Sequence, residues 1–205
     1  MTHEIREMMQ RPYRYFYEDG IAEIAVGGLF LALGLSLQAV EAAQSKSALM
    51  IVVAIGLPLL AICGGILLKK AVGGLKEHVT YPRTGYVSYK SKEPSRGRWL
   101  ISGAAIVFTV VLMLIPERFS QISIAEGGML FIILSYMGYR IGMKRFYLIG
   151  AIAALIGLAA AFLTTGDIPG STATFGGTGI VMIISGVIVL SIYLRKNRRP
   201  DENLR

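Results

Sequence analysis

Two carboxylates inside apolar stretches, Glu23 and Glu126, are the residues of this sequence best placed to do chemistry. Each follows an Ile-Ala dipeptide and is followed within a few residues by a Gly-Gly pair. An acid at the centre of a bilayer costs on the order of 3 kcal/mol when it is unpaired, so an ionisable group in a membrane span usually has a function. Such carboxylates could serve a small transporter or channel.

Both acids also have a structural interpretation. Glu23 stands near the start of its apolar stretch with Glu18 and Asp19 just before it, and acids in the first turn of a helix complement the helix dipole. Glu126 lies about one turn from the end of its stretch, where contact with interfacial water lowers the cost of the charge. The sequence leaves both interpretations open.

A second set of residues forms a compact polar and aromatic block outside the apolar stretches. The chain has β-branched and aromatic residues on both sides of a Pro-Arg-Thr-Gly turn, which predicts a short β-hairpin over 79–89. A lone hairpin is marginal in water, so it would lean on helix ends, lipid or a partner. We expect the contact with lipid or partner at Tyr81, Pro82, Arg83, Thr84, Gly85 and Tyr86.

Other chemistries lack the residues they need. The only histidines, His3 and His78, are far apart, and Cys63 is the single cysteine, which argues against a zinc site and an internal disulfide. No histidine lies in an apolar stretch, so a serine nucleophile there would have no imidazole base. We therefore expect no catalytic, cofactor-binding or metal-binding residues, and an intramembrane or lipid-modifying enzyme is the third hypothesis.

The elements that must position these residues follow from the composition. Of 205 residues, 54% are hydrophobic and 17% are charged, whereas soluble domains carry about 25% charged residues. The apolar residues gather in stretches of about 20, long enough to cross a hydrocarbon core of about 30 Å as helices. Strands of a membrane barrel would instead alternate polar and apolar residues. The predicted spans are Ile21–Val40, Ala48–Leu68, Trp99–Ile115, Ile122–Ile141, Phe146–Leu163 and Gly176–Leu194.

The sequence thus predicts an all-α integral membrane protein with six transmembrane helices and the hairpin between the second and third. Nineteen of its 21 Lys and Arg residues fall in alternate connecting segments. By the positive-inside rule, both termini are then expected on the cytoplasmic side of the plasma membrane. The predicted organisation is a cytoplasmic interfacial segment (1–20), two spans (21–68), a basic cytoplasmic loop (69–98), four spans (99–194) and a basic tail (195–205).

The net charge of +8 follows from this orientation. Bases beside a membrane are attracted to anionic lipid by about 1 kcal/mol each, and no nucleic-acid-binding motif accompanies them. We expect anionic headgroups at the cytoplasmic face and a protein partner as ligands, and no nucleic acid. The oligomeric state is left open, because Gly-rich helix faces can pack within one chain or between chains.

The loop block also carries a resemblance. Tyr17-Glu18-Asp19-Gly20 before the first span, with Lys76-Glu77-His78-Val79-Thr80-Tyr81-Pro82-Arg83-Thr84-Gly85-Tyr86-Val87 after the second, resembles a group of uncharacterised prokaryotic multi-span membrane proteins. The resemblance covers about 16 residues in its specific motifs. It implies no activity, and it implies that the loop is a family feature.

Two functional hypotheses follow. The leading one is a non-enzymatic interaction or regulatory membrane protein whose basic cytoplasmic loop engages anionic lipid or a partner. The alternative is a small transporter or channel that uses Glu23 and Glu126. Their shared Ile-Ala-Glu and Gly-Gly elements stand on helices of opposite direction, which is the plan of an inverted-repeat transporter, although the match is short and gapped.

Overall fold

Five helices make up the described part of the chain. The computed structural model describes residues 14, 16–42, 57–80 and 122–197. The helices are α2 (Ile21–Ala42), α4 (Leu57–Val79), α7 (Ile122–Ile141), α8 (Arg145–Leu163) and α9 (Asp167–Lys196).

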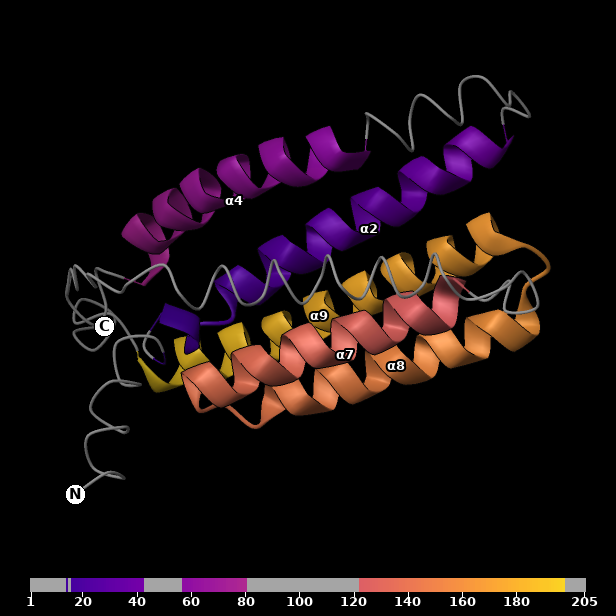
Figure 1. Ribbon diagram of the computed structural model, residues 1–205. Helices are drawn as coiled ribbons and strands as arrows, with labels where there is room; N and C mark the ends of the chain where they lie inside the picture. The colour runs from indigo at the N-terminus through magenta and orange to yellow at the C-terminus, as the bar shows by residue number, and fades with distance from the viewer. Residues whose placement is uncertain (1–13, 15, 43–56, 81–121, 198–205) are drawn as a thin grey trace.

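The helices lie side by side with their long axes roughly aligned (Figure 1). The most extensive contact joins α2 to α9, and α7 and α8 form a second close pair. Helix α9 also touches α7 and α8, while α4 contacts α2. Helix α9 is therefore the centre of the assembly, and it is the element that can connect residues on α2 with residues on α7.

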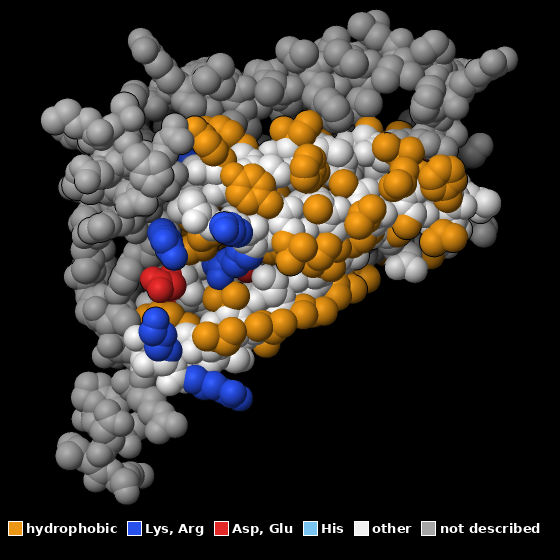
Figure 2. All heavy atoms as spheres, turned by 90° about the horizontal axis from the view of Figure 1, so that it is seen from below, with side chains coloured by type: hydrophobic (Ala, Val, Ile, Leu, Met, Phe, Trp, Pro, Cys, Tyr) orange, Lys and Arg blue, Asp and Glu red, His pale blue; other side chains and the backbone are white. Residues whose placement is uncertain are grey.

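Four of the described helices are long and apolar enough to cross a membrane: Ile21–Ala39 within α2, and α7, α8 and α9. Only about a third or less of each span is buried inside the protein, so most of its surface faces outward. Figure 2 shows hydrophobic side chains along the length of one face of the molecule. An apolar surface of this extent is expected of a protein that sits in lipid.

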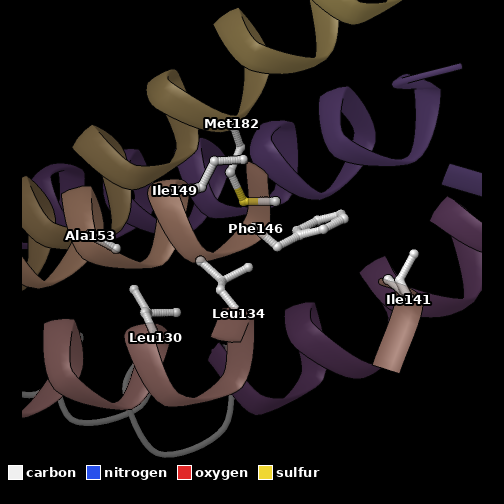
Figure 3. Close-up of a cluster of buried hydrophobic side chains, with 7 residues drawn as sticks. All are labelled: Leu130, Leu134, Ile141, Phe146, Ile149, Ala153 and Met182. Atoms are coloured by element: carbon white, nitrogen blue, oxygen red, sulfur yellow. The ribbon is translucent and has the colours of Figure 1, made fainter. Parts of the chain in front are cut away.

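The buried core lies where α7, α8 and α9 meet. Leu130 and Leu134 of α7 point toward Phe146 and Ile149 of α8, and Met182 of α9 inserts between them (Figure 3). A flexible thioether fills irregular gaps well, which suits a site where three helices converge.

Glycines let α2 and α9 approach closely. They recur every seventh residue on α2 and meet glycines of the antiparallel α9, and small residues permit such backbone contact in membranes. A Cβ added at Gly20, which precedes α2, or at Gly27 or Gly34 would come too close to the backbone of α9. The distances from the added Cβ are Gly20 to the Gly186 carbonyl O at 2.5 Å, Gly27 to the Gly179 carbonyl O at 2.7 Å, and Gly34 to the Gly176 N at 2.8 Å.

Helices α7 and α8 also approach closely at glycines. A Cβ at Gly127 would lie 2.9 Å from the Ala153 carbonyl O, and one at Gly157 would lie 2.9 Å from the Cα of Gly127. In the pairs Gly27-Gly28 and Gly127-Gly128 only the first glycine faces a neighbouring helix. A Cβ at Gly28 or Gly128 would meet no atom within 4 Å.

The structure corrects the prediction of six transmembrane helices with a β-hairpin. The described residues form five helices with four candidate membrane spans, and they contain no strand. The predicted span Trp99–Ile115 and residues 81–89 of the predicted hairpin lie outside the described residues. The first hairpin residue, Val79, is instead the last residue of α4, and Thr80 forms a turn in which its N–H donates to the Lys76 carbonyl O at 2.9 Å.

Helix α4 also differs from the predicted span Ala48–Leu68. It runs eleven residues past Leu68, through a segment that was predicted as loop, and α4 is not among the four candidate spans. The apolar stretch ends at Leu68, yet the helix does not, because Val72 packs against Ile21 and Ala22 of α2 and Lys76 pairs with α2's entry segment. Tertiary contacts therefore set the end of this helix.

Helix α9 begins nine residues before the predicted span Gly176–Leu194. The extra turns were expected to be a loop because they contain Gly, Pro, Ser and Thr. Pro169 is tolerated in the first turn, where its missing N–H would have no helical partner, and Asp167 complements the helix dipole there. Gly166, with φ +111°, makes the sharp entry from α8.

Candidate functional site

Glu23 lies at the end of the bundle where α2 begins, α4 and α9 end, and α7 turns into α8; we call this the cationic end. The Glu23 side chain is 1% exposed. Its Oε1 lies 2.7 Å from Nε of Arg145, the first residue of α8, and its Oε2 accepts a hydrogen bond from Ser185 Oγ of α9 at 3.1 Å. One acid thus joins three helices, and its charge is balanced by a guanidinium.

A second buried ion pair lies beside the first. Asp19, fully buried just before α2, accepts from Lys76 Nζ of α4 and from Oγ1 of Thr80, which follows α4, both at 2.9 Å to its Oδ2. Its Oδ1 accepts from the backbone N–H of Ile21 at 3.2 Å, which caps the start of α2. Asp19 therefore binds both the first residue of α2 and the residue that follows α4.

The same two cations also hold the backbone that leads into α2. Lys76 Nζ donates to the Phe16 carbonyl O, and Arg145 Nη2 donates to the Tyr17 carbonyl O. Lys76 lies 3.9 Å from the centroid of the Phe16 ring, and the Tyr17 and Phe146 rings meet edge to face at 5.7 Å. Together Asp19, Glu23, Lys76, Thr80, Arg145 and Ser185 form what we call the ion-pair cluster.

Burial sets the ionisation of the groups around this cluster. Desolvation lowers the pKa of Lys76 from its usual value, and the hydrogen bond and charge of Asp19 oppose that effect. Burial raises the pKa of the Tyr17 phenol, while the nearby charge of Arg140 acts against it. Tyr17 therefore stays neutral at physiological pH, and Lys76 depends on Asp19 to keep its charge.

Glu126 lies at the opposite end of the bundle, in the second turn of α7. Its Oε1 accepts a hydrogen bond from Ser171 Oγ of α9 at 2.8 Å. Its Oε2 is buried, and no described residue is its hydrogen-bond partner. The acid is thus held by one hydroxyl, with no guanidinium or ammonium from the described residues in contact with it.

Helix α9 carries a line of buried hydroxyls between the two acids. Ser171 and Ser185 bond Glu126 and Glu23 at its two ends. Thr174 and Thr178, both fully buried, lie between them at helical spacing. Thr174 Oγ1 donates to the Gly170 carbonyl O at 2.9 Å, and Thr178 Oγ1 has no partner within the described part of the chain. We call these four residues the α9 hydroxyl line.

The structure does not bring the two predicted acids together. Glu23 and Glu126 lie at opposite ends, and they differ in environment, since the first has a cation partner and the second has none in the described part of the chain. The predicted contact residues Tyr81, Pro82, Arg83, Thr84, Gly85 and Tyr86 lie outside the described residues.

Several residues of the site were not expected from the sequence. Asp19, Lys76 and Arg145 were assigned to solvated flanking segments, and Ser171 to a loop. The sequence did hold a signal for these residues. Asp19, Lys76 and Arg145 flank apolar stretches on the side predicted as cytoplasmic, where opposite charges can meet. The pairing itself could not be inferred, since it depends on which helices are neighbours.

Comparison with known protein families, with curated proteins and with solved structures finds no match to this chain. The resemblance to a group of prokaryotic multi-span membrane proteins therefore stays a prediction. Function has to be argued from the site alone.

Proposed function

We propose that the protein is a multi-pass protein of the plasma membrane, with both termini in the cytoplasm, that engages anionic lipid headgroups through its basic cytoplasmic side. In this proposal it does no enzymatic chemistry, and a protein partner is the alternative ligand. The observation that carries the proposal is the distribution of charge over the described helices.

The Lys and Arg residues of the described helices all lie in the half of the bundle at the cationic end, and Figure 2 shows several of them gathered there. The opposite end carries Glu41, Glu126 and Asp167. Lys76 and Arg145 belong to the ion-pair cluster, whereas five other bases are exposed. The exposed ones are Arg14, Lys70, Lys144, Arg195 and Lys196.

This asymmetry supports both the orientation and the ligand. Cations collect on the cytoplasmic side of membrane proteins. Each cation at an anionic surface contributes about 1 kcal/mol of attraction, so five exposed bases are enough to enrich anionic lipid around this end. The predicted loop block 81–86 follows directly after Thr80, which Asp19 holds at the same end.

Deletion of residues 81–87 tests the role of the loop. Thr80 is kept, so that its bond to Asp19 and the end of α4 are preserved. After mild extraction of the full protein, we expect the deletion variant to recover clearly less anionic lipid or partner at unchanged membrane insertion.

A variant with Lys46→Gln and Arg118→Gln, in the segments predicted on the other side of the membrane, is the matched control and should behave as the parent. Undiminished recovery by the deletion variant would show that the loop is not the binding element.

A second candidate, proton or cation transport, is supported by the α9 hydroxyl line. It runs along the buried face of one helix between the two acids, and Gly179 and Met182 are the buried residues between Thr178 and Ser185. Buried polar residues in spans commonly mark ion paths. In this candidate Glu126 is the carrier group, and Glu23 is fixed by Arg145.

Flux into proteoliposomes, driven by a potassium gradient with valinomycin, tests this candidate. Thr178→Val and Glu126→Gln should each lower proton flux several-fold. Ser191→Ala, which changes an exposed hydroxyl of the same helix, should leave it unchanged. Equal flux for protein-free vesicles and the parent would remove transport from consideration.

A further inference from the structure

Glu126 is a half-buried acid with one buried carboxylate oxygen, and the described residues do not balance its charge. One carboxylate oxygen accepts from Ser171 Oγ, and the other, Oε2, is enclosed without a hydrogen-bond partner among the described residues. Beside Ser171, a Cβ at Gly170 would meet the Ser123 side chain and lie 3.3 Å from Thr164 Oγ1, so hydroxyls gather around Gly170. Hydroxyls can donate one bond each, but they carry no charge.

The charged groups on the helices around Glu126 do not compensate it. On α9 the nearest is Asp167, an acid whose charge acts on Glu126 with the same sign. The ionisable residues of α8, Arg145 and Tyr147, stand at the cationic end of that helix, and so does Arg140 of α7. Within the described part of the chain no Lys, Arg or His faces Glu126.

The contrast with Glu23 shows what is missing. Glu23 is more deeply buried, yet it has a guanidinium at 2.7 Å and a hydroxyl. An isolated carboxylate in apolar surroundings is so costly that the group is neutralised instead. A bound proton on Oε2 removes the charge and turns the unpartnered acceptor into a donor.

We propose that Glu126 is a reversible proton-binding site, with Ser171 as the group that positions its carboxyl. Uptake forms an O–H bond on Oε2 with a proton taken from water, and release returns that proton to water. Because Glu126 lies in the second turn of α7, exchange occurs at the end opposite the cationic end.

This inference is independent of lipid engagement, and it deepens the transport candidate by naming its ligand. A proton on Glu126 does not require flux, so the two are tested separately.

The apolar reagent dicyclohexylcarbodiimide tests the site, because it adds to protonated carboxyl groups within the bilayer. Native membranes are treated at neutral pH and the labelled residue is identified by mass spectrometry. We expect labelling of Glu126 several-fold above Glu23, loss of the label in Glu126→Gln and its retention in Glu23→Gln. Ser171→Ala should change the labelling rate while the site stays reactive.

Infrared spectra of the reconstituted protein decide the question where reagent access fails. A carboxylic-acid C=O band at neutral pH that is absent from Glu126→Gln, and that declines in the parent as the pH is raised, supports the proposal. Spectra of the parent and the variant that show the same carboxylic-acid band, or none, at neutral pH would overturn it.

Discussion

At the scale of single residues, the two acids show how partners decide what a buried charge does. Glu23 has a cation and a hydroxyl and joins three helices, whereas Glu126 has a hydroxyl alone. The sequence predicted both as unusual groups in apolar stretches. It could not distinguish them, because Arg145 is 122 positions away from Glu23 in the chain and meets it only because α2 and α8 both pack on α9.

Removal of Arg145 alone should strongly destabilise the fold. Arg145→Gln leaves Glu23 buried without its counter-ion, and breaking a buried pair in this way costs about 3–5 kcal/mol. The free energy of unfolding in mixed detergent micelles measures the effect.

The double variant Glu23→Gln with Arg145→Gln should recover a large part of that loss, since it buries no charge. If the double variant lost as much stability as the sum of both single variants, the ion pair would not be what holds these helices.

At the scale of helices, glycine spacing sets the closest contacts. The Gly-Gly pairs are visible in the sequence, but the closest contacts of α2 with α9 are made at Gly20, Gly27 and Gly34, which recur every seven residues. Hydropathy placed four spans well and located the ends of α4 and α9 poorly. The end of α4 depends on a tertiary contact made by Lys76, and the start of α9 on local features at Gly166, Asp167 and Pro169.

The adjacent residues Gly27 and Gly28 offer a matched test of the α2 and α9 contact. Gly27→Ala places a Cβ 2.7 Å from the Gly179 carbonyl O and should cost about 1–3 kcal/mol by overpacking. Gly28→Ala enters open space and should stabilise α2 by up to about 1 kcal/mol, because alanine is the better helix former. Unfolding of both variants in mixed micelles gives the comparison, and an equal response would contradict this packing.

At the scale of the whole molecule, charge is separated along the helix axes. The described cations lie toward one end, with apolar side chains along the spans (Figure 2). This separation could be predicted from the sequence, because it depends only on which residues flank the apolar stretches. The number of spans and the hairpin could not, since both required knowing which segments pack together.

Reporter fusions test the proposed orientation. Green fluorescent protein fused after Arg205 should fluoresce, and alkaline phosphatase at the same position should be inactive, because both termini are proposed to lie in the cytoplasm. Fusions after Thr165, between α8 and α9, should give the opposite pair of results. The same response at both positions would contradict α9 as a membrane-crossing helix.

The most direct test of the proposed function is the lipid that stays on the intact protein. Mass spectra are recorded of the full chain released from nanodiscs with equal amounts of phosphatidylglycerol and phosphatidylcholine. We predict that complexes with phosphatidylglycerol dominate, and that this excess falls when Lys144, Arg195 and Lys196 are all changed to Gln. Equal retention of the two lipids by the parent protein would contradict the account.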